Sequence, residues 1–150
     1  MTPKRLFSIF AIGEAITWAL LILGMILKYG TRTTDVLVSI GGGLHGFMFL
    51  AFLVVTLLVG ISQAWRPWVT LLGLASAVLP FTTIPFDVWA SRTGKLDGPW
   101  QLAPGGRAPR GGVEKAVQWA FGHVWLTAGV LAAFVVVVFT TLVVVGPPGS

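Results

Sequence analysis

Residues 36–61 read VLVSIGGGLHGFMFLAFLVVTLLVGI, a run without Asp, Glu, Lys or Arg. A helix needs about 20 predominantly apolar residues to cross roughly 30 Å of hydrocarbon. Lipid offers no water to the backbone, so a segment of this kind must form a helix rather than an open strand. This stretch therefore predicts a transmembrane helix. It also indicates that apolar stretches on either side of it should be considered as membrane spans.

Three similar apolar stretches flank it, at residues 6–27, 68–89 and 116–145. Hydrophobic residues make up 55% of the 150 residues and charged residues only 10%, which a water-exposed surface does not allow. The length leaves no room for a second folded domain. We expect residues 1–150 to form one all-α domain, a four-helix transmembrane bundle.

The first apolar run follows Lys4 and Arg5, as in a secretory signal peptide. It is too long for one, and it contains Glu14 and Trp18. We therefore expect it to be retained as a span. The chain has no cysteine, which excludes disulfides, thiolate metal sites and a cysteine nucleophile.

Residues 90–115 are rich in glycine and proline and carry several basic residues, a composition typical of a flexible connector. A solvated basic loop and a site for anionic lipid or an acidic partner surface are both open interpretations. The formal charge of +5 resides mostly in loops, where it indicates topology, and we expect no nucleic acid partner.

An even number of spans would place the two termini on one side of the membrane. Four spans put Lys4, Arg5 and Arg66 on that side, and seven basic residues on the other: Lys28, Arg32, Arg92, Lys95, Arg107, Arg110 and Lys115. Because cytoplasmic loops carry an excess of Lys and Arg, this count predicts both termini outside and residues 90–115 in the cytoplasm.

An ionisable residue inside a span costs free energy because its charge is removed from water, and such residues are often functional. Glu14 and His45 lie at similar depths in adjacent antiparallel spans, so we expect them to pair. Trp18 lies one helical turn after Glu14. Lys28 is on the same face at the membrane boundary, and Asp87 closes the third stretch near the interface. The pair predicts either a structural hydrogen bond or a site for protons, ions or a ligand.

Gly42 and Gly46 flank His45 with the small-xxx-small spacing that permits close helix packing. Pro80 and Pro85 predict a kink in the third span. His123 follows Trp119 by one turn, as an ordinary interfacial histidine would. Two histidines could ligate a haem iron, but His45 and His123 are predicted at different depths. We expect no catalytic residue, no metal site and no cofactor.

The chain resembles the YdzA-like family of small bacterial integral membrane proteins, a domain of unknown function with a His-Gly signature. The resemblance covers roughly residues 8–90 and rests on Glu14, Leu27–Gly30, Gly43–Gly46, Ala75–Val78 and Pro80–Phe81. It implies a three-helix core in a bacterial plasma membrane and no particular activity. The basic loop and the fourth span are additions to that pattern.

Three functions remain open at this point. We expect an accessory or structural subunit of a larger respiratory or transport complex, because the predicted spans contain few polar or ionisable residues. A homo-oligomer is the other form of association. The alternatives are a small proton- or solute-translocating protein that uses Glu14 and His45, and a haem- or lipid-binding membrane protein.

Overall fold

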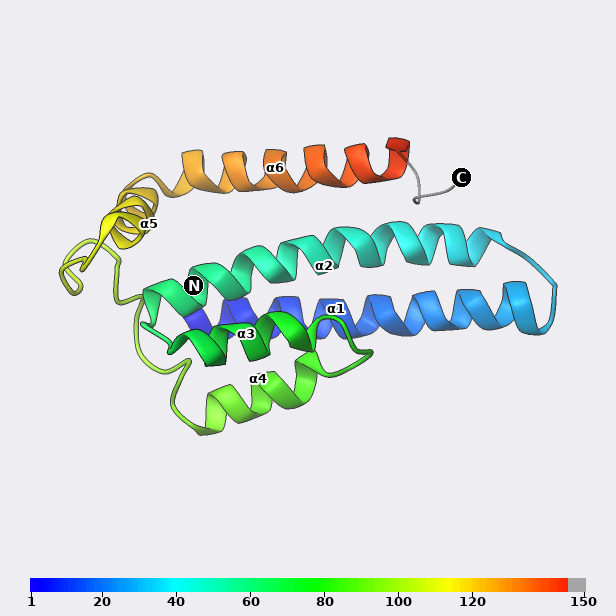
Figure 1. Ribbon diagram of the computed structural model, residues 1–150, viewed down its shortest axis with the longest axis horizontal. Helices are drawn as coiled ribbons and strands as arrows, with labels where there is room; N and C mark the ends of the chain where they lie inside the picture. The colour runs from blue at the N-terminus through cyan, green and yellow to red at the C-terminus, as the bar shows by residue number, and fades with distance from the viewer. Residues whose placement is uncertain (146–150) are drawn as a thin grey trace.

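The computed structural model describes residues 1–145, and within them every regular element is a helix (Figure 1). The predicted all-α helical bundle is confirmed. The elements are α1 (Pro3–Met25), the π-helix η1 (Ile26–Gly30), α2 (Val36–Ser62), α3 (Pro67–Ser76), α4 (Thr83–Arg92), α5 (Gly112–Gly122) and α6 (Val124–Val145). Within residues 1–145, three helical segments are long and apolar enough to cross a membrane: Pro3–Gly30, Val36–Ser62 and Val124–Thr141.

Close packing joins α1 and α2 along their length. A Cβ atom on Gly24 would lie 2.6 Å from the Val38 backbone, and one on Gly41 would lie 3.1 Å from the Leu20 backbone. Hydrogen at these two positions lets the backbones approach each other. The predicted packing residues face side chains of neighbouring helices rather than their backbones: Gly42 is beside the Leu21 side chain of α1, and Gly46 is beside the ring of Phe139 in α6.

The third apolar stretch was predicted to be a single kinked span, and the structure differs from this prediction. It forms two ten-residue helices, α3 and α4, which fold back on each other as a hairpin (Figure 1). Pro80 lies in the turn rather than within a helix. Pro85 is in the first turn of α4, where a helix needs no backbone donor. Each helix rises about 15 Å, half the thickness of the hydrocarbon layer.

The hairpin begins and ends at the end of the bundle that holds the N-terminus (Figure 1). The following loop stays there: Trp65 Nε1 donates to Lys95 O at 2.8 Å, and Trp100 Nε1 donates to Met1 O at 2.8 Å. The predicted separation of this loop from the N-terminus is therefore wrong, because residues 68–89 reverse direction instead of crossing. Of the ten Lys and Arg residues, only Lys28 and Arg32 lie at the end of the bundle opposite to the N-terminus.

An ion pair fixes the end of the basic loop to the start of α5. Arg107 donates to both carboxylate oxygens of Glu114, at 2.6 and 2.8 Å, and Arg110 N donates to Glu114 Oε2 at 2.6 Å. The hydrogen bonds from Arg107 lower the pKa of Glu114 to about 2. Arg107 also reaches Ile61 O at 3.4 Å, so the ion pair connects the loop to the end of α2.

The fourth apolar stretch is divided as well. Residues 116–145 were predicted as one span, but the helix breaks at His123, where φ is −126° and ψ is 52°. α5 lies at the N-terminal end of the bundle, and α6 runs back alongside α2 towards the opposite end (Figure 1). The break after Gly122 separates the short helix α5 from α6, which is long enough to span a membrane.

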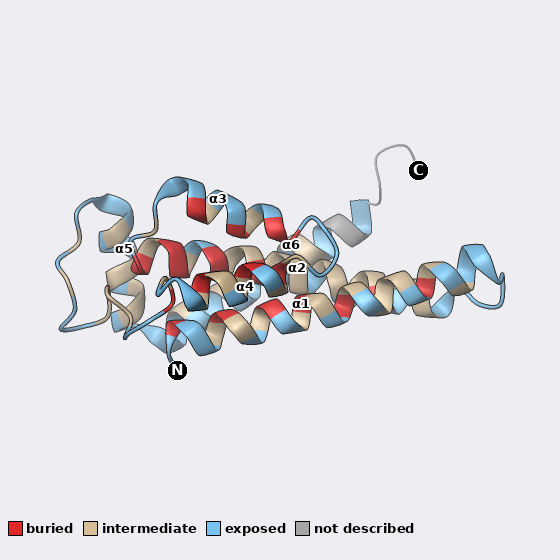
Figure 2. Ribbon diagram, turned by 90° about the horizontal axis from the view of Figure 1, so that it is seen from below, coloured by how far each residue is buried: buried red, intermediate tan, exposed pale blue. Residues whose placement is uncertain are grey.

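Buried residues concentrate where α1, α2 and the hairpin meet, in the half of the bundle nearer the N-terminus (Figure 2). Phe7 packs at its centre, with ring centroids 5.3 Å from Phe52, 5.8 Å from Phe86 and 5.9 Å from Trp65. α6 contributes little to this core, and 6% of its spanning window is buried. The core is therefore a two-helix pair with a half-length hairpin against it.

The glycine contacts predict a difference between two neighbouring alanine substitutions. Gly24→Ala must push α1 and α2 apart, and should lower the free energy of unfolding by roughly 1–3 kcal/mol. Gly42→Ala meets only a flexible leucine side chain, 3.7 Å away, and should be neutral or slightly stabilising. Denaturant titration in detergent measures both. Equal stability of the two variants would contradict the packing described.

Candidate functional site

Glu14 is fully buried, at 0% exposure, between α1, α2 and the start of α4. Its Oε2 atom lies 3.3 Å from Thr83 Oγ1, which also donates to Ala11 O at 3.0 Å. The single hydroxyl proton of Thr83 is shared between these two acceptors. Thr83 is itself fully buried, so this contact fastens α4 to the middle of α1.

His45 completes the cluster from α2. Its Nδ1 atom lies 3.9 Å from Glu14 Oε1 and 3.3 Å from Thr17 Oγ1. The Thr17 hydroxyl donates to Glu14 O at 2.9 Å, so its oxygen can accept a hydrogen bond from His45 in the tautomer that carries hydrogen on Nδ1. The Trp18 ring packs against the imidazole, with centroids 4.3 Å apart. Glu14, Trp18 and His45 therefore lie together, as the sequence predicts.

The turn at residues 77–82 receives hydrogen bonds from this cluster and from within itself. Trp18 Nε1 donates to Ala77 O at 3.4 Å. Thr82 Oγ1 donates to Ser76 O and to Leu79 O. Backbone carbonyls that leave a helix in an apolar environment need such partners. The polar side chains of α1 thus hold the hairpin turn as well as each other.

The structure separates the other predicted residues from this cluster. Lys28 is exposed in η1 at the far end of α1, with Nζ 5.4 Å from the Tyr29 ring centroid. Asp87 accepts a hydrogen bond from Ser8 Oγ at 3.0 Å, and Ser8 lies about 1.7 turns before Glu14 in α1. This second contact joins α4, at Asp87, to α1, at Ser8.

His45 and His123 do not face each other. His123 is exposed at the junction of α5 and α6 and stacks on Trp119, with centroids 4.5 Å apart. Gly46, next to His45, contacts Phe139, which is about 24 Å along α6 from His123. Among the described residues, no three His, Cys, Asp or Glu side chains group as metal ligands would.

Thr17 and Thr83 belong to the site but were not predicted. Thr17 lies three residues after Glu14, on the same helical face, so its spacing was a usable signal. Thr83 reaches Glu14 only because the chain reverses at residues 77–82, where Pro80 indicates a kink as readily as a turn. The assembled cluster can share a proton between Glu14 and His45, or it can hold three helices together. Neither of the two apolar cavities described is lined by Glu14 or His45.

Thr83→Val tests the contribution of the cluster to the fold. The substitution keeps the size of the side chain but leaves Ala11 O and Glu14 Oε2 without their buried donor. We expect it to lower the free energy of unfolding by about 1–3 kcal/mol. Thr93→Val is the control, because Thr93 is exposed and donates mainly to Trp89 O in its own helix. Equal losses in the two variants would show that the contact between Thr83 and Glu14 has no special importance.

Comparisons with known proteins support a membrane protein of unknown function. The chain is 48% identical over 96 residues to the protein of Streptomyces coelicolor named "Putative membrane protein SCO5905". The match covers 63% of this chain but spans only 11% of that longer relative. No solved structure matches the chain. Residues 4–92, from the start of α1 to the end of α4, match the family described as a domain of unknown function, DUF3817, and the chain belongs to this family of membrane proteins.

Proposed function

We propose that this protein is an accessory module that packs against a larger membrane protein through the tip of its hairpin. The observation that carries the proposal is the exposure of the turn at residues 77–82. Val78, Leu79 and Phe81 are 62%, 61% and 46% exposed. Non-helical backbone at membrane depth is tolerated where protein covers it or where it lines a water-filled cavity. The apolar side chains at this tip favour a protein cover.

The depth of the tip follows from the length of the hairpin. Ten residues of α3 rise about 15 Å from the end of the bundle, which reaches the middle of a layer roughly 30 Å thick. The contacts of Trp18 and Glu14 with Ala77 and Thr83 put the turn level with the middle of α1. The hairpin is thus re-entrant, and its tip meets lipid tails unless a partner covers it.

The relative from Streptomyces coelicolor supports a large partner rather than a second copy. In that protein the matched segment is 11% of a much longer chain, so the domain there lies in one polypeptide with other parts. In this protein we propose that the same core packs against other membrane segments of a respiratory or transport complex. Most of its polar groups serve its own fold.

The distribution of charge gives the orientation that we propose. Eight of the ten Lys and Arg residues lie at the end that holds the N-terminus, the hairpin ends and the basic loop. Cytoplasmic segments carry such an excess, so this end faces the cytoplasm of a bacterium and α6 leads away from it across the plasma membrane. Both termini were predicted outside, from a topology that the hairpin replaces.

Photocrosslinking at the tip tests the proposal. A benzophenone amino acid at Leu79, with the chain expressed in its native host, should give one crosslinked product that contains a larger membrane protein. The control position is Leu71, which is 65% exposed on the shaft of α3 and should crosslink mainly to lipid. Products that contain only lipid, or only a second copy of the chain, would overturn the accessory role.

A proton pathway is the second candidate, because Glu14 Oε1 is buried without a hydrogen-bond partner and lies 3.9 Å from His45 Nδ1. The accessory role predicts that liposomes containing the protein conduct protons no faster than empty liposomes. It also predicts that Glu14→Gln, which keeps the acceptor for Thr83, remains folded. Proton flux that Glu14→Gln and His45→Ala abolish in folded protein would establish the pathway instead.

A further inference from the structure

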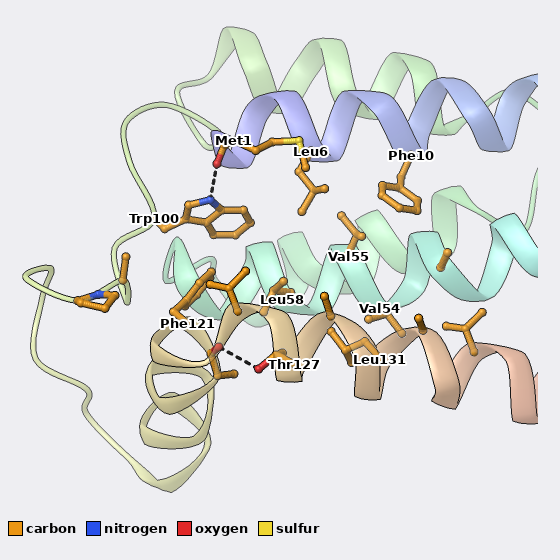
Figure 3. A pocket seen from close by; sticks show the side chains of 18 of the residues that line it. Met1, Leu6, Phe10, Val54, Val55, Leu58, Trp100, Phe121, Thr127 and Leu131 are labelled. Atoms are coloured by element: carbon orange, nitrogen blue, oxygen red, sulfur yellow. Dashed lines mark hydrogen bonds between the residues drawn. The ribbon is translucent and has the colours of Figure 1, made fainter.

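An apolar groove of about 690 Å³ separates α6 from the α1 and α2 pair (Figure 3). Leu6 and Phe10 of α1, Val54 and Leu58 of α2, and Leu131 of α6 line its length. The rings of Trp100 and Phe121, with centroids 4.9 Å apart, lie at its N-terminal end. Its volume is within the range of about 300–1,000 Å³ typical of small-molecule sites.

The two polar side chains in the lining, Trp100 and Thr127, already have partners. Trp100 Nε1 donates to Met1 O at 2.8 Å, and Thr127 Oγ1 donates to Ala120 O at 2.9 Å (Figure 3). A ligand inside the groove therefore finds apolar contacts and no vacant hydrogen-bonding side chain. Apolar spaces of this kind do not hold water well. A hydrocarbon chain meets these requirements.

The end of the groove near Trp100 is the basic end of the molecule, and Arg5 is one of the exposed cations at that end. Met1 and Leu6, on either side of Arg5 in the sequence, both line the groove, and Arg5 is exposed. Lys4 shares a helical face with Ser8, which donates to Asp87 of α4 on the hairpin side. Arg107 is already paired with Glu114. Because its neighbours in the sequence line the groove, Arg5 is the side chain that we assign to a negative headgroup at this end.

We propose that the groove binds an acyl chain of one anionic phospholipid, whose phosphate contacts Arg5. The lipid fills the space between α6 and the core, which explains how α6 can lie alongside α2 with so little of its own surface buried against protein. This inference does not depend on the accessory role, because it concerns the opposite side of the α1 and α2 pair from the hairpin.

Native mass spectrometry tests the inference on the full chain released from nanodiscs of equal parts phosphatidylglycerol and phosphatidylcholine. We expect one phosphatidylglycerol to be retained per chain, in preference to phosphatidylcholine. Ala132→Phe places a ring in the groove lining and should abolish retention. The matched control Ala133→Phe, on the same helix but outside the lining, should retain the lipid.

A second pair of variants tests the headgroup contact. Arg5→Gln should lower the preference for phosphatidylglycerol about fivefold, since one basic residue near an anionic surface contributes on that scale. Lys28→Gln, at the opposite end, should leave the preference unchanged. Equal retention of the two lipids, no retained lipid, equal behaviour of Ala132→Phe and Ala133→Phe, or a second chain in place of lipid would each overturn the proposal.

Discussion

In the re-entrant arrangement that we propose, the backbone groups at the turn between α3 and α4 lie near the bilayer centre with no water to bond, and this constraint organises the core. Trp18 supplies a donor for Ala77 O, and Thr82 supplies one for Ser76 O. Glu14 in turn accepts a hydrogen bond from Thr83 at the start of α4. A carboxyl group in the middle of α1, costly on its own, thus becomes the attachment point of a half-length hairpin.

The hairpin also determines where the rest of the chain lies. Because residues 67–92 return to the end where they start, the basic loop packs beside Met1, and α5 begins at the N-terminal end of the bundle. α6 then runs along a different face of α2 from the hairpin, and Phe139 meets Gly46 there. α6 contacts α2 but little else of the family-like core, which consists of α1 to α4. This leaves a groove between α6 and that core.

Much of this fold could be predicted from residue types, and the rest required contacts distant in the sequence. The uncharged run at residues 36–61 was enough to predict α2. The similar depths of Glu14 and His45 in adjacent spans were enough to predict that the two side chains lie close together. The reversal at Pro80 was missed because a proline in an apolar run indicates a kink as readily as a turn. Gly24 and Gly41 were missed because their importance depends on the Val38 and Leu20 backbones opposite them.

Cysteine accessibility tests the re-entrant hairpin most directly, because the natural chain has no cysteine to interfere. Single variants Thr2→Cys, Thr33→Cys and Ala108→Cys would be labelled in intact cells with a membrane-impermeant maleimide, and again after permeabilisation. A hairpin that returns to its starting side predicts that positions 2 and 108 are labelled together and position 33 from the opposite side. Labelling of positions 2 and 108 from opposite sides would show that residues 68–89 cross the membrane, and would contradict this account.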